Sequence, residues 1–156
     1  MKYLKSNLPF ILLSIFLLLA CQDDDEQVSP PEVSTIAVND VGVSTATVSG
    51  IVTAIGSAPV TERGVIISTT PNSSLSSAQQ RSAGSGEGAF EVSITNLNSN
   101  TTYFVRAYAT SSVETALGSE LQFTTEAPPE VDNISPADEE TNVNVNSSIV
   151  VSFNKP

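Results

Sequence analysis

Apolar and polar residues alternate along the middle of the chain. Between residues 45 and 53, one face carries Ala46, Val48, Gly50 and Val52, and the other carries Thr45, Thr47, Ser49 and Thr53. The same two-residue period returns with apolar faces at Phe90, Val92 and Ile94, at Tyr103, Val105, Ala107 and Ala109, and at Leu121 and Phe123. An alternation with one polar face is typical of antiparallel strands that pack on one side. Several such strands at short spacing predict an all-β protein built as a two-sheet sandwich.

The first 20 residues follow a different pattern. Lys2 and Lys5 precede an apolar run from Phe10 to Ala20 that only Ser14 interrupts. A membrane-spanning helix needs about 20 apolar residues, so this run is too short, and the small residue Ala20 marks a cleavage point. We therefore expect residues 1–20 to be a signal peptide that is removed on export, rather than a permanent helix.

The single cysteine of the chain follows directly, at position 21. The stretch Leu18-Leu19-Ala20-Cys21 resembles the lipobox of bacterial lipoproteins. This resemblance implies that the thiol of Cys21 takes a diacylglyceryl group, that cleavage occurs before Cys21, and that its new amine is acylated. One acyl chain binds a membrane weakly, whereas two or three bind it firmly. The predicted partner is therefore a membrane, through a lipid anchor; the alternative is a free or buried cysteine.

An acidic run comes next, formed by Gln22, Asp23, Asp24, Asp25 and Glu26. Clustered like charges repel one another and stay extended, so residues 21–31, which end in Ser29-Pro30-Pro31, are expected to form a disordered tether. The run is also similar to the acidic export signal that follows the lipidated cysteine in one group of Gram-negative bacteria. That resemblance implies a protein anchored in the bacterial outer membrane and facing the cell exterior. The two interpretations are compatible.

Charge and composition exclude several classes of function. The net charge is −11, and removal of residues 1–20 leaves 4 basic and 17 acidic side chains, or −13. Such a chain is repelled by nucleic acid and by anionic lipid head groups, so neither is an expected partner. Without histidine, and with its one cysteine assigned to lipid, the chain has no nucleophile–imidazole pair and no His- or Cys-ligated zinc site. No cofactor is expected, and no disulfide can form within the chain.

The stretch from Leu97 to Ala109, with its Leu…Thr-x-Tyr-x-Val-x-Ala spacing, resembles the E–F corner and F strand of a fibronectin type III domain. The resemblance implies that Leu97 and Tyr103 form a tyrosine corner, with the Tyr103 ring in the core and its hydroxyl bonded back to the preceding turn. Further similarity to bacterial surface lipoproteins of this family lies in Glu62-Arg63-Gly64-Val65, Gly118 and Phe123-Thr124-Thr125. We thus expect residues 32–126 to form a fibronectin type III/Ig-like antiparallel β-sandwich. Because the chain lacks tryptophan, Val48 or Val52 is expected to fill the place of the usual strand-B tryptophan.

Residues 68–88 are rich in Ser, Gly and Gln and are expected to form a flexible inter-strand loop. The run Gly84-Ser85-Gly86-Glu87-Gly88 is not a phosphate loop, because the required lysine and strand–turn–helix context are missing.

Residues 127–133 contain Pro128-Pro129 and are predicted to be a linker. Residues 134–156 resemble the opening of a bacterial Ig-like domain of the S-layer-protein type, with Ile149, Val151 and Phe153 alternating as in a strand. A sandwich of about 100 residues cannot close on such a fragment. We therefore expect these residues to be the truncated start of a domain in a longer protein.

Three functions agree with these patterns. The first is a non-catalytic surface spacer that presents a downstream domain. The second is a glycan- or protein-binding module that uses Phe104, Arg106 and Tyr108. The alternative for these three side chains is that packing covers them, because aromatic residues on such strands are mostly packing residues.

The third is the N-terminal part of a surface carbohydrate-active enzyme, for which Glu62, Glu87 and Glu91 are the nearest carboxylates to the glycine-rich loop. We expect no catalytic residue in the chain. A calcium site formed by Asp132, Asp138, Glu139 and Glu140 is less favoured than a solvated turn, because the spacing is not that of an EF-hand.

Overall fold

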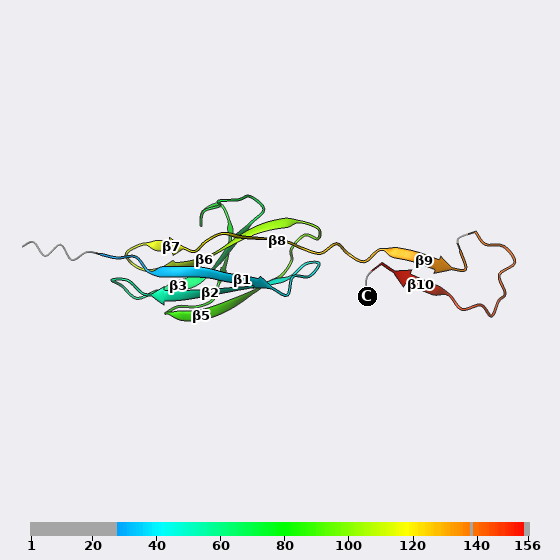
Figure 1. Cartoon of the computed structure of the whole chain (residues 1–156), viewed down its shortest axis with the longest axis horizontal. Coiled ribbons are helices and arrows are strands. Elements are labelled where there is room, and N and C mark those ends of the chain that lie inside the picture. The colour runs from blue at the N-terminus through cyan, green and yellow to red at the C-terminus, as the bar shows by residue number, and fades with distance from the viewer. Residues whose placement is uncertain (1–27, 138, 155–156) are drawn as a thin grey trace, which may run out of the picture.

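The computed structural model describes residues 28–137 and 139–154, and the predicted signal peptide, Cys21 and the acidic run lie outside this part of the chain (Figure 1). The described residues form strands and connecting segments and contain no helix. The strands are β1 (Glu32–Asn39), β2 (Ala46–Ala54), β3 (Glu62–Ser68), β4 (Gln79–Ser82), β5 (Gly88–Ile94), β6 (Thr102–Thr110), β7 (Thr115–Leu117), β8 (Leu121–Thr124), β9 (Val131–Ser135) and β10 (Val150–Phe153). Every pairing between them is antiparallel, which confirms the all-β prediction.

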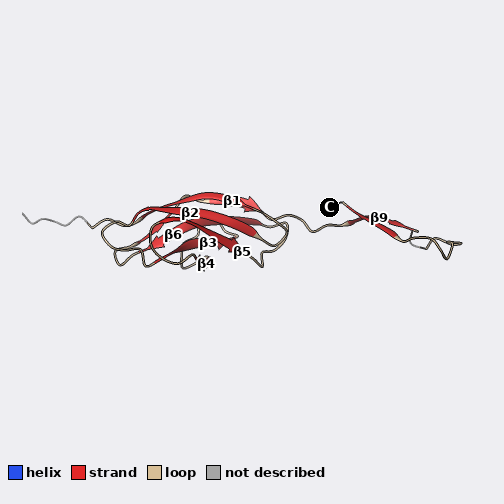
Figure 2. Ribbon diagram, turned by 90° about the horizontal axis from the view of Figure 1, so that it is seen from below, coloured by secondary structure: helices blue, strands red, loops and turns tan. Residues whose placement is uncertain are grey.

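The first eight strands form two sheets that lie face to face (Figure 2). One sheet has the order β1-β2-β5, and the other has the order β4-β3-β6. The short strands β7 and β8 follow one another along the free edge of β6, where β7 pairs with residues 108–110 and β8 with residues 102–105. The segment between them, residues 118–120, contacts both β6 and β1: the Gly118 N–H donates a hydrogen bond to the carbonyl oxygen of Ala107, and the Ser119 carbonyl oxygen accepts one from the Thr35 hydroxyl.

The inner faces of the two sheets form one hydrophobic core, and the alternation predicted for β2, β5 and β6 is confirmed. Val48 and Val52 are both buried in this core, in agreement with the expectation that a valine replaces a strand-B tryptophan. β-branched side chains suit such a core because they pack well on a pleated surface. The core residues are Ala46, Val48, Val52, Val60, Val65, Ile67, Phe90, Val92, Ile94, Tyr103, Val105, Ala107, Ala109 and Phe123.

The structure corrects the expectation of an uninterrupted loop over residues 68–88. Strand β4 lies within this range and pairs with β3 from Gly64 to Ile67. β4 is an edge strand with exposed or half-exposed polar side chains, in the sequence Gln-Gln-Arg-Ser. An edge strand of this kind needs no apolar face and benefits from polar side chains that discourage further pairing, so it leaves no hydrophobic period in the sequence.

Strands β9 and β10 form a separate two-stranded hairpin, and β9 begins at Val131, inside the range assigned to the linker. An irregularity near the end of β10 makes Asp132 an extra residue in β9, so that Val131 pairs with Phe153 while Ile134 pairs with Val151. Directly paired residues share a face, and the extra residue thus brings four apolar side chains onto the same face. All four are about half exposed. One face of the hairpin is therefore apolar and uncovered in the described residues.

Candidate functional site

Strand β1 is fastened to the opposite sheet through Thr35. The Thr35 hydroxyl donates a hydrogen bond to the carbonyl oxygen of Ser119 at 2.6 Å and accepts one from the backbone N–H of Ala107 at 2.9 Å. Gly118 permits this approach, because a Cβ at that position would lie 2.6 Å from both the nitrogen and the hydroxyl oxygen of Thr35. The contact joins the first strand of the sandwich to β6 and to the turn between β7 and β8.

The corner before β6 is built around Tyr103, whose ring is buried and stacks on Phe123 with 5.8 Å between the ring centroids. Its hydroxyl accepts a hydrogen bond from the backbone N–H of Asn98 at 2.9 Å. The partly buried Leu97 packs against the core beside it. These contacts have the geometry of a tyrosine corner, in which the hydroxyl of a core tyrosine holds the preceding turn.

The structure corrects the expectation that Tyr108 presents its ring on a binding face, because Tyr108 is 0% exposed. Its hydroxyl donates a hydrogen bond to Glu62 Oε1 at 3.0 Å. Burial, and then the hydrogen bond and negative charge of Glu62, raise the pKa of Tyr108 to about 12. Tyr108 pairs with Gly64 on β3, and a Cβ at Gly64 would overlap the carbonyl oxygen of Arg81 on β4. The backbone of β4 at Arg81 thus lies against the outer face of the sheet beside Tyr108.

The other two residues of that predicted binding face are half-buried. Phe104 lies between Ser68 on β3 and Gln122 on β8, and Arg106 donates a hydrogen bond from Nε to the carbonyl oxygen of Gly118 at 2.8 Å. The β3–β4 loop reaches the far edge of the same sheet, where the N–H of Asn72 donates to Glu120 Oε2 at 2.7 Å. The three residues therefore do not form an open aromatic row.

The carboxylates considered for catalysis are not brought together. Glu62 accepts the hydrogen bond of Tyr108 on the outer side of one sheet, whereas Glu91 accepts one from the Ser49 hydroxyl at 3.2 Å on the outer side of the other. Residues 28–137 and 139–154 contain no group of three or more acidic side chains that could hold a metal ion, and Asp138 of the considered calcium site lies outside them. The described residues contain no helical segment that could span a membrane.

The glycine-rich loop before β5 is held by Arg63, a role that the sequence did not reveal. Its Nη1 donates hydrogen bonds to the carbonyl oxygens of Gly86, Glu87 and Gly88 at 3.3, 2.6 and 3.2 Å. Its guanidinium carbon lies 5.3 Å from the centroid of the Phe90 ring. At this point three carbonyl oxygens converge on a cation, whereas a phosphate site needs converging N–H donors. The loop is fastened to β3 instead of being free.

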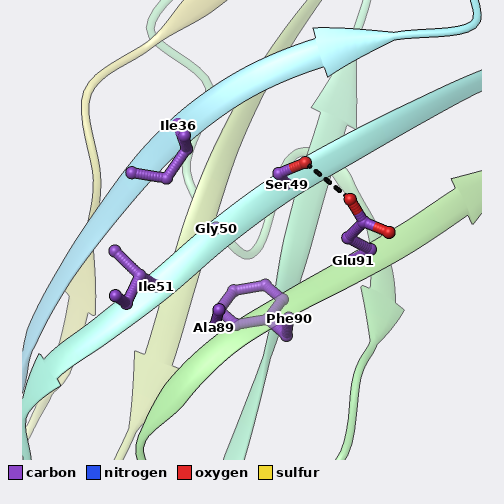
Figure 3. A pocket seen from close by; sticks show the side chains of 7 residues that line it. All are labelled: Ile36, Ser49, Gly50, Ile51, Ala89, Phe90 and Glu91. Atoms are coloured by element: carbon purple, nitrogen blue, oxygen red, sulfur yellow. Dashed lines mark hydrogen bonds between the residues drawn. The ribbon is translucent and has the colours of Figure 1, made fainter.

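A hollow of about 610 Å³ lies on the outer face of the β1-β2-β5 sheet (Figure 3). No pattern in the sequence indicated it. Strand β1 contributes Ile36, β2 contributes Ser49, Gly50 and Ile51, and β5 contributes Ala89, Phe90 and Glu91. The hydrogen bond between Ser49 and Glu91 crosses from β2 to β5 on one side of the hollow (Figure 3). The other side is formed by aliphatic side chains.

The chain enters and leaves the sandwich at opposite ends (Figure 1). Before β1, the backbone of Ser29 is hydrogen-bonded to Ser57 in the β2–β3 loop, and Pro31 is buried. The structure thus corrects the prediction of a disordered tether over residues 21–31 at its end, where residues 29–31 are fixed to the sandwich. After β8, Glu126 donates from its N–H to the carbonyl oxygen of Gly42 in the β1–β2 loop, and its own carbonyl accepts from the N–H of Asn100. Because the β1–β2 and β2–β3 loops lie at the two ends of β2, the length of the sandwich separates the two points of attachment.

No family model matches the sequence. No curated protein matches it significantly either. Among solved structures, the sensor domain of the anti-sigma factor RsgI4 from Pseudobacteroides cellulosolvens (short form) is 20% identical, with a TM-score of 0.49, and the match covers 65% of this chain and 99% of that one. The sixth fibronectin type III domain of human fibronectin type III domain containing protein 3 is 21% identical, with a TM-score of 0.43 and coverage of 65% and 85%. The fourth fibronectin type III domain of a human protein is 18% identical, with a TM-score of 0.46, and the match covers 65% of this chain and 82% of that one. The strand order of this chain, β1-β2-β5 in one sheet and β4-β3-β6-β7 in the other, is itself that of a fibronectin type III/Ig-like antiparallel β-sandwich.

Proposed function

We propose that the sandwich is a non-catalytic spacer in a lipid-anchored protein of the bacterial surface, and that it presents a further domain away from the membrane. The observation that carries the proposal is the path of the chain, which enters beside Ser57 and leaves beside Gly42 and Asn100 at the other end. A module with this path adds its full length to the distance between the segments attached at its two ends. The lipobox-like stretch that ends at Cys21 supplies the anchor in this proposal.

Two contacts suit a module that must stay folded while attached at both ends. Thr35 joins the first strand to the opposite sheet, and Arg63 fastens the loop before β5. The Thr35 hydroxyl and the Arg63 Nη1 group are both used within the fold, which supports a structural role for them rather than a role in binding a ligand.

The hairpin of β9 and β10 supports the presence of a second module. An isolated two-stranded hairpin is marginally stable in water, and stability requires further strands or a covering layer on its apolar face. The face formed by Val131, Ile134, Val151 and Phe153 provides the surface on which such a layer would pack. In this proposal, the layer belongs to an Ig-like domain whose first strand is β9, which begins at Val131 rather than at the predicted residue 134.

Distance from the membrane tests the spacer function. Because lipidation uses the thiol of Cys21, a cysteine introduced elsewhere is the single site for a fluorescent label. We would compare Pro59→Cys, at the entry end, with Ser99→Cys, at the exit end, in vesicles that contain a lipid-bound quencher. Both positions are exposed. The spacer function predicts stronger quenching at position 59 than at position 99, and equal quenching at the two positions would contradict it.

A further inference from the structure

We propose that the hollow on the outer face of the β1-β2-β5 sheet is a docking site for a basic partner protein. One apolar side chain of the partner would pack between Ile36 and Ile51, and one neighbouring lysine or arginine would pair with Glu91. This interaction goes beyond the spacer function and does not depend on the lipid anchor.

The first argument is the placement of Ile36. In the pairing of β1 with β2, Thr35 lies opposite Gly50 and Ala37 lies opposite Ser49, so Ile36 is the extra residue of a β-bulge. Val33 and Thr35 face the core before the bulge and Val38 faces it after the bulge, whereas Ile36 lies on the outer face with its side chain 58% exposed. Bulges commonly redirect a side chain toward a functional surface. Strand β1 thus exposes an isoleucine at the hollow, next to a buried threonine.

The second argument is the contrast between the hollow and its surroundings. Ile36, Ile51 and Ala89 bring aliphatic side chains to the hollow from three neighbouring strands. The other outward-facing positions of β2 and β5 carry hydroxyl groups or an acid, at Thr47, Ser49, Thr53, Glu91 and Ser93. A small apolar centre with a polar rim is the usual composition of a protein–protein contact.

The third argument is charge. The exposed Glu91 carboxylate accepts a hydrogen bond from the neutral Ser49 hydroxyl, and the arginines of the described residues are used elsewhere. Arg63 and Arg106 donate to backbone carbonyls, and Arg81 donates to Gln79 and Gln80. Residues 28–137 and 139–154 contain 12 acidic and 3 basic side chains, a net charge of −9. Complementary charge favours a basic partner and disfavours an acidic one.

The same observations disfavour a glycan as the occupant. Sugar rings pack on exposed aromatic faces, but Phe90, the aromatic residue of the hollow, is only 7% exposed. Its ring is directed toward the core, where a Cβ on Gly50 would lie 2.6 Å from its Cζ. The accessible surface of the hollow is therefore aliphatic and acidic.

The test is a titration of the isotope-labelled chain with three acetylated peptides, followed by NMR. The peptides are Gly-Lys-Phe-Lys-Gly, the acidic control Gly-Glu-Phe-Glu-Gly, and the apolar-deleted control Gly-Lys-Ser-Lys-Gly. We expect the first peptide to shift the amide signals of residues 36, 49–51 and 89–91, and to bind at least about tenfold more tightly than either control. Its affinity should fall as salt is added, because an exposed ion pair is screened.

Variants of the hollow make the test specific. Ile36→Ser and Glu91→Gln should each weaken binding of the Lys-Phe-Lys peptide several-fold. The controls Ile55→Ser and Glu114→Gln change exposed residues outside the hollow and should leave binding unchanged. The melting temperature of each variant verifies its folding.

The proposal would be overturned by no binding of the Lys-Phe-Lys peptide, equal binding of the acidic peptide, shifts that map outside the hollow, or equal effects of the control variants. Concentration-dependent shifts in the hollow without peptide would also overturn it, because the occupant would then be a second copy of the chain.

Discussion

Replacement of Thr35 by valine tests whether a single hydroxyl group closes the sandwich. The two side chains have nearly the same shape, so the change removes the hydrogen bonds to Ala107 and Ser119 without opening a cavity. The Ala107 N–H is left in the interior, where the residue is 0% exposed and water cannot replace the lost acceptor. The carbonyl of Ser119 belongs to an exposed residue and can bond to water instead.

The expected cost follows from this difference. A buried donor that loses its partner costs about 1–3 kcal/mol, whereas an exposed acceptor costs little. We expect Thr35→Val to lower the free energy of unfolding by about 2 kcal/mol. For a domain of this size, that loss lowers the melting temperature by roughly 8–16 °C and the urea midpoint by about 1–2 M. Thr35→Ser keeps the hydroxyl and loses one methyl group, at a cost of about 0.8 kcal/mol or less.

Urea unfolding followed by circular dichroism measures these changes. Thr53→Val is the matched control, because Thr53 is exposed and its hydroxyl makes only a 3.5 Å contact with Glu32. We expect it to change stability by less than about 0.5 kcal/mol. The reasoning would be refuted if Thr35→Val were as stable as the Thr53→Val control, or if Thr35→Ser lost as much stability as Thr35→Val.

Three further substitutions test other contacts. Tyr103→Phe removes the acceptor of the Asn98 N–H and should cost about 1–3 kcal/mol; an unchanged melting midpoint would show that this hydroxyl does not hold the corner. Gly64→Ala places a Cβ where the Arg81 carbonyl lies and should cost about 1–3 kcal/mol; faster hydrogen exchange in β4 would mark the separation of that strand, and wild-type exchange would contradict the expected clash. The pKa of Tyr108 is raised from 10.0 to about 12, so its neutral form is favoured in the folded state. Stability should be complete below pH 10 and fall as the pH rises toward 12, because the unfolded chain releases this proton first. Tyr108→Phe should lose this pH dependence, and an identical alkaline profile in both proteins would contradict the assignment.

The faces of the main strands were predictable because alternation is a local property of the sequence. Residues 46–52, 90–94 and 103–109 contain enough apolar positions to define an inner face, and the structure buries that face. The position of β4 was not predictable in this way, because an edge strand that carries Gln, Arg and Ser has the composition of a loop.

Contacts between distant segments were beyond the reach of the sequence pattern. Alternation correctly places Tyr108 opposite the Tyr103 face, but it does not tell whether other chain segments cover that outer face, as they do here. Similarly, nothing in the order of Thr35 and Ile36 indicates a bulge, so the buried hydroxyl and the exposed isoleucine both required the pairing of β1 with β2. The hollow combines Ile36, the extra residue of that bulge, with residues of β2 and β5, so no local motif marked it.

The central claim is that the mature protein begins at a lipidated cysteine from which the β-modules extend. Mass spectrometry of the mature N-terminus, after expression of the full chain in a Gram-negative bacterium, tests this claim most directly. We predict that the chain begins at Cys21 and carries the mass of a diacylglyceryl group and an amide-linked acyl chain, and that Cys21→Ser remains unprocessed. A mature protein that is free in the medium with an unmodified Cys21 thiol, or normal processing of Cys21→Ser, would contradict the claim.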